Sequence, residues 1–202
     1  MSRVYILGAG GCGREIASWL LDCACMQGHS IAGFLDTDTA LPGVVGSDKD
    51  WPVGSDDLFV CGVSDPALKE IVVAPLLARG ATFLRPIHPS AVIARDAAIG
   101  TGSVIGWNAV VSTNAAVGRF VTVVGSATIG HDAVVGDFST LCCHADLTGH
   151  VRLTDGVLVG SHGTVLPGVV VGRRSIVGAG AVVTANVPEK TTVFGVPATR
   201  LR

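Results

Sequence analysis

The stretch Ile129-Gly130-His131-Asp132-Ala133-Val134-Val135-Gly136 shows the six-residue repeat that runs through about half of the chain. An aliphatic residue stands at position 129 and returns six residues later at 135. With this spacing and no slip, aliphatic residues occupy sixteen positions: Ile93, Ile99, Ile105, Val111, Val117, Val123, Ile129, Val135, Leu141, Leu147, Leu153, Val159, Val165, Val171, Val177 and Val183. A fixed short repeat of this kind predicts a parallel β-helix over residues 86–187.

The hexads also predict how the coils are built. Each hexad is expected to supply one short strand and one corner, with the aliphatic side chain pointing inward. The residue four positions after each aliphatic is always Ala, Ser, Val or Gly, which we interpret as the small residue that lets the corner turn. Three hexads close one coil, so residues 18 apart should stack at roughly 4.8 Å, the spacing of neighbouring strands.

Residues 1–85 follow a different pattern, in which short apolar strands alternate with helices. Strands are expected at 3–7, 30–35, 58–62 and 82–84, and helices at 14–25 and 66–79. This order predicts a small α/β domain with a parallel sheet. We expect it to cover one end of the β-helix, and the tail 188–202 to cap the other.

Composition narrows the class of protein further. Hydrophobic residues make up 49% and charged residues 15% of the 202 residues, which excludes a disordered chain. The net charge of -2 gives no reason to expect nucleic acid or an anionic membrane as partner. Six cysteines without framework spacing are expected to be free thiols of a cytoplasmic protein.

Four motifs occur in an order that resembles a known family. They are Ile6–Glu15 (ILGAGGCGRE), Ile87–Ala91 (IHPSA), Gly130–Asp137 (GHDAVVGD) and Gly195–Ala198 (GVPA). Together they resemble the hexapeptide-repeat acyltransferases with a left-handed β-helix. Within these, the chain is similar to the sialic-acid O-acyltransferase NeuD family, which includes N-acetyltransferases of nucleotide-linked amino sugars. The resemblance implies a Rossmann-like first domain, a homotrimer, and acetyl-CoA in the groove between neighbouring subunits.

His131 is the predicted catalytic residue. Acetyl transfer from a thioester needs a base that takes a proton from the attacking amine or hydroxyl, and a neutral imidazole suits this role near pH 7. The resemblance places the catalytic base at His131 and its acidic helper at Asp132. The alternative is an exposed corner histidine without a role.

The 18-residue rule places Gly149 over His131 and His150 over Asp132. A glycine above the base would leave space for a substrate, and its backbone N–H could bind the oxyanion of the tetrahedral intermediate. Equally, Gly149 could merely turn a corner. An Asp132–His150 contact between coils is also expected.

The resemblance implies that acetyl-CoA runs along the later coils. The matching cofactor-binding residues, besides Gly149, are Gly160, Ser161, Gly178, Ala179, Ala181, Pro197 and Arg200. The family often carries a second histidine where this chain has Thr140, which leaves the shape of the acetyl end of the site open.

The first domain carries a Gly8-x-Gly10-x-x-Gly13 turn, which fits the dinucleotide fingerprint. A domain of about 85 residues lacks the second half that normally holds a nicotinamide. The resemblance implies instead that the turn cradles the phosphates of a nucleotide-sugar. The predicted substrate-binding residues are Gly8, Gly10, Gly11, Cys12, Gly13, Arg14, Asp36 and Asp38. A domain that has lost its ligand, or one that binds NAD, are the alternatives.

The sequence therefore predicts an acetyltransferase that moves acetyl from acetyl-CoA to the amine of a nucleotide-linked amino sugar by direct attack. O-acetylation of sialic acid or a related sugar is the alternative within the class. From other classes, a metal-dependent hydratase using His144, His150 and His162, or a non-catalytic nucleotide-binding scaffold, stays open. No metal is expected, because the His131-Asp132 motif argues against that use of the histidines.

Overall fold

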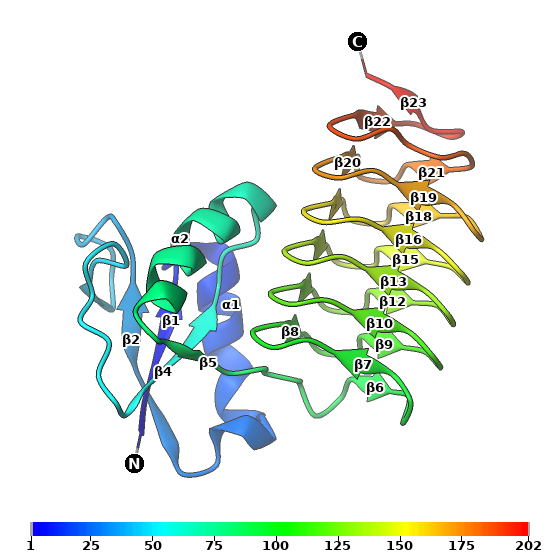
Figure 1. Ribbon diagram of the computed structural model, residues 1–202. Coiled ribbons are helices and arrows are strands. Elements are labelled where there is room, and N and C mark those ends of the chain that lie inside the picture. The colour runs from blue at the N-terminus through cyan, green and yellow to red at the C-terminus, as the bar shows by residue number, and fades with distance from the viewer. Residues whose placement is uncertain (1, 202) are drawn as a thin grey trace.

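The computed structural model describes residues 2–201, which form an α/β domain beside a long β-helix (Figure 1). The α/β domain holds a five-stranded parallel sheet with the order β3-β2-β1-β4-β5. Its elements are β1 (Ser2–Leu7), α1 (Gly11–Trp19), the 3₁₀ turns Leu20–Asp22 and Ala24–Met26, β2 (His29–Leu35), β3 (Val44–Gly46), β4 (Asp57–Cys61), α2 (Pro66–Ala78) and β5 (Thr82–Phe83).

Two details of this domain differ from the sequence prediction. Helix α1 begins at Gly11 and ends at Trp19, where two 3₁₀ turns replace its expected last turns. The strand β3 was not expected, because three residues, Val44–Gly46, are too few to show a strand pattern. Helix α2 agrees closely with the prediction, and the Asp65 carboxylate accepts a hydrogen bond from the Leu68 N–H as its N-cap.

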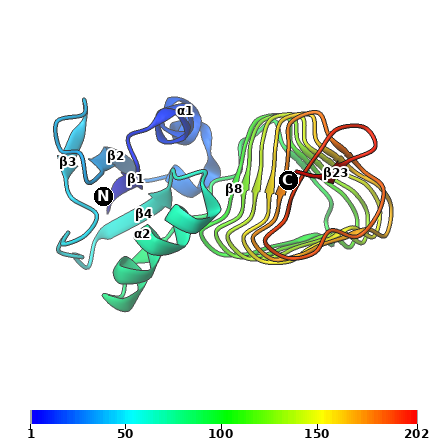
Figure 2. The same ribbon diagram turned by 90° about the horizontal axis from the view of Figure 1, so that it is seen from above.

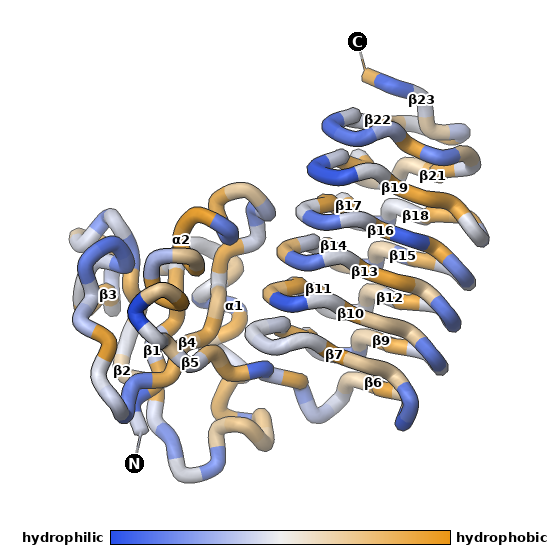
Figure 3. The backbone as a smooth tube through the Cα atoms, viewed as in Figure 1, coloured by the Kyte–Doolittle hydropathy of each residue, from blue (hydrophilic) through white to orange (hydrophobic). Residues whose placement is uncertain are grey.

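The β-helix consists of sixteen two-residue strands, and each one ends at a predicted aliphatic residue. They are β6 (Val92–Ile93), β7 (Ala98–Ile99), β8 (Val104–Ile105), β9 (Val110–Val111), β10 (Ala116–Val117), β11 (Thr122–Val123), β12 (Thr128–Ile129), β13 (Val134–Val135), β14 (Thr140–Leu141), β15 (Asp146–Leu147), β16 (Arg152–Leu153), β17 (Leu158–Val159), β18 (Thr164–Val165), β19 (Val170–Val171), β20 (Ile176–Val177) and β21 (Val182–Val183). The second residue of each strand from Ile105 onward is buried in one continuous core. Figure 3 shows the apolar colour along these strands.

Strands 18 residues apart pair in parallel, as the repeat predicts. For example, Ile129 lies opposite Val111 on one side and Leu147 on the other. Three sheets result, and seen along its axis the β-helix is a triangular coil (Figure 2). This regular parallel pattern fits a left-handed β-helix. We call β8-β11-β14-β17-β20 the domain-facing sheet, β6-β9-β12-β15-β18-β21 the first outer sheet and β7-β10-β13-β16-β19 the second outer sheet.

The corners turn at a residue that the sequence did not reveal. The third residue after the aliphatic has a positive φ at every corner from Gly102 to Gly180, including φ of 59° at both Asp132 and His150. The small residue that follows, such as Ala133, is fully buried. The small residue therefore fills the inside of the corner, and the left-handed residue before it makes the turn.

Each coil has three corners, which differ in the sheets that they join. The His131 corner (130–133 and its equivalents 18 residues apart) joins the two outer sheets. The Phe138 corner (136–139) joins the second outer sheet to the domain-facing sheet. The His144 corner (142–145) leads from the domain-facing sheet to the first outer sheet.

The α/β domain packs against the flank of the β-helix, and not over its end as expected (Figures 1 and 2). Phe120, at a left-handed corner position, belongs to the hydrophobic core of the α/β domain. Its ring meets Phe83 edge-on at 4.9 Å and stacks on Phe138 at 5.4 Å between centroids. Burial of this ring offsets the cost of a bulky residue at positive φ.

A fully buried lysine fastens the same interface. The Lys69 ammonium on α2 donates to the hydroxyls of Thr122 and Thr140, both at 2.9 Å, and to the Ser139 carbonyl at 3.2 Å. All three acceptors are uncharged. Burial is the main reason why the pKa of Lys69 falls to about 8. Thr140 in turn donates to the Ser64 carbonyl at 2.6 Å, which links the loop after β4 to the β-helix.

The tail continues the domain-facing sheet. Strand β22 (Thr192–Phe194) pairs in parallel with β20, and β23 (Thr199–Arg200) turns back antiparallel to β22. No helix within residues 2–201 has the length and apolar character to cross a membrane.

We predict that Lys69 makes the stability of the protein rise with pH. Its folded-state pKa of about 8 lies below the unfolded value of 10.5. The unfolded chain therefore binds more protons between these pH values, and the dehydration cost, at most about 3 kcal/mol, fades as pH rises through them. The difference in free energy of unfolding between the natural chain and Lys69→Met should increase from pH 7.5 to pH 10.5 in urea titrations.

The exposed Lys49 provides the control for this measurement. The difference between the natural chain and Lys49→Met should stay flat over the same range. A flat difference for Lys69→Met as well would show that its amine keeps its hydration in the folded chain.

Candidate active site

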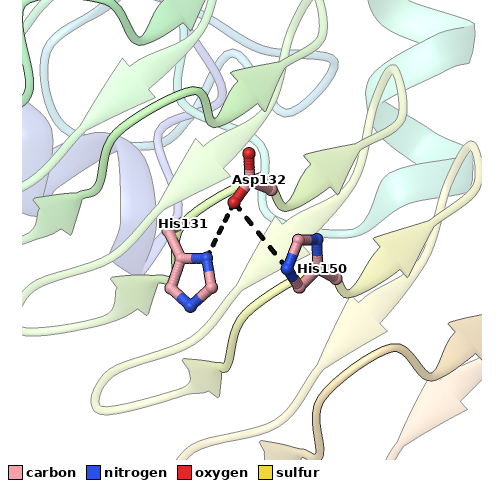
Figure 4. Close-up of side chains that lie close together, drawn as sticks. All are labelled: His131, Asp132 and His150. Atoms are coloured by element: carbon pink, nitrogen blue, oxygen red, sulfur yellow. Dashed lines mark hydrogen bonds and ion pairs between the residues drawn. The ribbon is translucent and has the colours of Figure 1, made fainter.

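His131 and Asp132 form a hydrogen-bonded pair at a corner of the β-helix (Figure 4). The His131 Nδ1 lies 2.8 Å from the Asp132 Oδ2, and the two side chains are 55% and 37% exposed. The left-handed conformation at Asp132 is part of the repeated corner, so the coil itself fixes where this side chain starts.

Neighbouring coils hold the Asp132 carboxylate from both sides. The Asn114 amide, 18 residues earlier, donates to Oδ1 at 3.3 Å, and the His150 Nε2, 18 residues later, lies 3.8 Å from Oδ2. The His131 and His150 rings meet edge-on with centroids 5.0 Å apart. The hydrogen bond from His131 is the main reason why the pKa of Asp132 lies below its usual range. The hydrogen bond from Asn114 and the charge interaction with His150 lower this pKa further.

This arrangement decides which nitrogen of His131 can act as a base. An ionised carboxylate only accepts hydrogen bonds, so the proton of the neutral imidazole lies on Nδ1. The lone pair is then on Nε2, the nitrogen that does not contact Asp132. The pair therefore presents a proton acceptor on a half-exposed imidazole, and the carboxylate can stabilise the imidazolium that forms.

Gly149 lies against the His131 ring, as the 18-residue rule predicts. A Cβ at Gly149 would lie 2.5 Å from Nε2 and 2.6 Å from Cε1 of His131. The volume that a side chain would take is therefore filled by the ring, which corrects the expectation that glycine leaves this space for a substrate. Glycine is needed here so that the imidazole can lie over the next coil.

A second site lies in the α/β domain at the carboxyl ends of its strands. A cleft of about 510 Å³ is lined there by the predicted residues Gly8, Gly10, Gly11, Cys12 and Asp36, and further by Gly62, Val63, Ser64, Asp65 and Leu68. It adjoins a smaller pocket of about 310 Å³ that Leu35, Thr37, Asp48 and Val72 also line. The helix N-terminus at Gly10 and Gly11 points unpaired N–H groups toward such a cleft, which suits an anion.

Asp36 shapes the Gly-rich turn. Its Oδ2 accepts a hydrogen bond from the Ala9 N–H at 2.9 Å, and its Oδ1 accepts one from the Asp38 N–H at 3.0 Å. A Cβ at Gly13 would lie 1.9 Å from the Gly8 carbonyl oxygen. Gly13 therefore permits close packing of helix and strand.

Three predicted substrate-binding residues lie outside the lining of this cleft. Gly13 is buried beneath the turn, and Arg14 donates to the Ala9 carbonyl at 2.7 Å, which anchors the turn. Asp38 is exposed, and its carboxylate accepts a hydrogen bond from the Ala40 N–H. Their observed contacts shape the loop.

The predicted cofactor residues, Gly149 apart, lie away from His131. Five of them belong to the His144 corner, which the width of the first outer sheet separates from His131: Gly160, Ser161, Gly178, Ala179 and Ala181. Ala181 is fully buried, which contradicts a contact between its side chain and a ligand, since it fills the inside of a corner. Pro197 and Arg200 are exposed in the tail.

The structure groups the histidines differently from the trio that the metal hypothesis requires. His144 and His162 stack at 4.8 Å between ring centroids on the His144 corner, whereas His150 lies on the His131 corner. The trio of His144, His150 and His162 is therefore wrong. His131, Asp132 and His150 do lie together, with ligand atoms within 4.8 Å of one another.

Sequence reasoning missed Asn114, Ser64 and the buried Lys69. The 18-residue rule contains the signal for Asn114, which stands one coil before Asp132. Thr140, the position where the resemblance suggested a second histidine, is fully buried between Lys69 and Ser64. Its side chain serves the contact between the two domains.

Comparison with known proteins finds acetyltransferases among the similar structures. No protein-family model matches the chain. A variant of perosamine N-acetyltransferase from Caulobacter crescentus, in complex with CoA and GDP-perosamine, is 25% identical with a TM-score of 0.93, and the match covers 100% of this chain and 98% of that one. The acetyltransferase domain of PglB from Neisseria gonorrhoeae, in complex with acetyl coenzyme A, is 27% identical with a TM-score of 0.89 over 99% of both chains.

Curated relatives match only part of the chain. A putative acetyltransferase of Schizosaccharomyces pombe is 44% identical over 52 residues, which is 26% of this chain and 25% of that protein. The chain thus matches about a quarter of the length of this relative.

We predict that Gly149→Ala displaces the His131 ring. The new methyl carbon would lie 2.5 Å from Nε2, so the imidazole must swing away and lose its hydrogen bond to Asp132. A crystal structure of the variant should show the shift, and ¹⁵N NMR of the ring should show the loss of a fixed Nδ1–H form.

Gly168 offers a matched control at the same corner one coil later. It has φ of 74° and open space around its missing Cβ, so Gly168→Asn, which tolerates this backbone conformation, should leave His131 in place. An unmoved ring in Gly149→Ala would contradict the close approach.

Proposed function

We propose that the chain is an acetyl-CoA-dependent N-acetyltransferase that acts on the amine of a nucleotide-linked amino sugar, with His131 as general base. One observation carries the proposal: the hydrogen bond from His131 Nδ1 to Asp132 leaves Nε2 as the proton acceptor of a half-exposed imidazole. The fold around it is shared, along the whole chain, with a perosamine N-acetyltransferase.

The reaction is a direct transfer. As the sugar nitrogen attacks the thioester carbonyl, Nε2 of His131 takes the amine proton, and the charge of Asp132 stabilises the resulting imidazolium. The tetrahedral intermediate collapses with cleavage of the C–S bond, and the CoA thiolate receives the proton from the imidazolium. The Gly149 N–H, beside the ring, is our candidate donor to the oxyanion.

The α/β domain is the proposed nucleotide-sugar site. Its strand order β3-β2-β1-β4-β5 and its Gly8-x-Gly10-x-x-Gly13 turn support a Rossmann-like domain. The cleft of about 510 Å³ at the N-terminus of α1 supports phosphate binding there. We assign the chain on these grounds to the sialic-acid O-acyltransferase NeuD family, among its N-acetyltransferases of nucleotide-linked amino sugars.

The active unit is a homotrimer in which each site is shared between subunits. The His131 corner joins the two outer sheets, opposite the sheet on which the α/β domain packs. A sugar held in the nucleotide cleft of one chain therefore reaches His131 of a neighbour. The cofactor residues on the His144 corner are likewise separated from His131 by a whole sheet, which supports acetyl-CoA binding in a groove between subunits.

Acetyl-CoA follows the His144 corner toward the tail in this proposal. Gly160, Ser161, Gly178 and Ala179 offer it backbone groups, and the exposed Pro197 and Arg200 lie where the tail ends the coils. We place the reaction in the cytoplasm, where thiols stay reduced, because all six cysteines are free.

We predict that His131→Ala lowers turnover by at least about a hundredfold, since general-base catalysis of this kind contributes that much. Acetyl-CoA binding, measured by calorimetry, should be retained. The assay follows the acetylated product by mass spectrometry with a panel of nucleotide-linked amino sugars. Near-normal turnover of His131→Ala would remove His131 from the mechanism.

Asp132→Asn should also slow turnover, because the amide lacks the charge that stabilises the imidazolium. Asn keeps the left-handed backbone, so folding is preserved. Asp96 is the matched control, since it stands on the same corner two coils earlier and accepts a hydrogen bond from Thr113. Asp96→Asn should retain the natural rate, and equal losses in both variants would argue against a specific role for Asp132.

A shared site predicts that two inactive chains can complement each other. Gly11→Glu places a negative charge at the first turn of α1, which favours the helix but repels a phosphate. Mixed oligomers of His131→Ala and Gly11→Glu chains should regain activity, up to about a quarter of the natural level when the chains mix at random.

The complementation control is a mixture of the separately assembled variants without subunit exchange, which should stay inactive. Failure of properly mixed oligomers to regain activity would show that the cleft and His131 of one chain work together.

A further inference from the structure

His131, Asp132 and His150 bring three metal-ligating side chains to one corner (Figure 4). We propose that this corner is also an inhibitory site for a divalent transition metal of the Zn²⁺ type, held by both imidazoles and the carboxylate. The inhibition rests on the proposed function, because it acts through the same His131. The binding itself does not depend on it.

The ligand atoms lie within 4.8 Å of one another, which is close to the spacing around one metal ion. Ligands about 2.0–2.2 Å from a tetrahedral zinc lie about 3.3–3.6 Å from one another. The Asp132 Oδ2 lies 2.8 Å from His131 Nδ1 and 3.8 Å from His150 Nε2, on either side of that range. The three side chains are 55%, 37% and 65% exposed, so small rotations bring the atoms to the required distances.

The donor set selects the kind of metal. Two imidazole nitrogens and one carboxylate oxygen suit Zn²⁺ and its transition-metal neighbours, whereas Mg²⁺ prefers oxygen ligands and keeps its water. The site is open to solvent on the side of His150, so water completes the coordination. The edge-on approach of the two rings at 88° lets both nitrogens face the carboxylate.

Metal binding reverses the tautomer that catalysis needs. As a base, His131 keeps its proton on Nδ1, bonded to Asp132, and its lone pair on Nε2. A metal takes the lone pair of Nδ1, so the single proton of the neutral ring moves to Nε2. The nitrogen that should accept the amine proton then carries one itself. Catalysis and metal binding at this corner are therefore mutually exclusive.

His150 separates the two roles, because only the metal needs it as a ligand. His150→Asn keeps a residue that tolerates φ of 59° but removes the imidazole. The matched control is His144→Asn, which removes a histidine with the same φ from the His144 corner. That corner carries Cys142 and Cys143, so the control also reports any zinc bound there.

The test titrates Zn²⁺ into the metal-free full-length protein by calorimetry, with Mg²⁺ as the comparison ion. We expect one Zn²⁺ per chain at the corner, affinity reduced at least about tenfold in His150→Asn and unchanged in His144→Asn, and no Mg²⁺ binding. The Co²⁺ spectrum should lack thiolate charge-transfer bands. Equal Zn²⁺ affinity in the natural chain and His150→Asn, or loss of binding in His144→Asn, overturns the site.

The second arm measures inhibition of acetyl transfer, relative to the metal-free rate of each variant. The Zn²⁺ concentration for half-inhibition should rise at least about tenfold in His150→Asn. Zinc bound at the corner without loss of turnover overturns the inhibition. The two proposals fail separately, since a chain without acetyl transfer still shows Zn²⁺ binding by calorimetry, and an active chain that binds no Zn²⁺ loses only the metal site.

Discussion

The rest of the structure depends on the way in which each coil closes after 18 residues. Hydrogen bonds run from each coil to the next, as in the bond from the His150 N–H to the His131 carbonyl. Because no residue is inserted between hexads, a given position always faces its equivalents above and below. The chain can therefore build a site from residues that are distant in sequence but occupy one column, and Asn114, Asp132 and His150 are such a column.

The second constraint is that the α/β domain packs in one fixed position against a flank of the β-helix. Lys69 reaches into the domain-facing sheet, and Phe120 joins the core of the other domain. A buried ammonium without a carboxylate partner is costly, and here the three acceptors that meet its three N–H groups offset only part of that cost. The interface thus fixes the proposed nucleotide-sugar cleft opposite the His131 corner, and this separation makes the neighbouring subunit part of the chemistry we propose.

The sequence predicted the strands of the β-helix because one aliphatic residue per hexad must enter a narrow core. It did not predict the left-handed corners, because Asn, Asp, His, Phe and Gly all occupy that position and leave no common composition. The role of Lys69 was hidden for a related reason, since a lysine on an expected helix normally faces solvent. His131 and Asp132 were found through a motif, whereas their partner Asn114 needed only the 18-residue rule.

The corner explains why the proposed base sits where it does. A strand residue points either into the core or outward from one sheet face, as the exposed Arg152 does. A corner residue instead lies at the edge where two sheets meet, while its backbone stays hydrogen-bonded to the neighbouring coil. The backbone hydrogen bonds between coils offset the cost of the positive φ at Asp132. They do so for different side chains, since His150 adopts the same conformation one coil later. The scaffold therefore accepts exchange of one side chain in the column without refolding. It follows that the chemistry around His131 can change by single substitutions, and that His150 is a feature of this corner which the fold itself does not require.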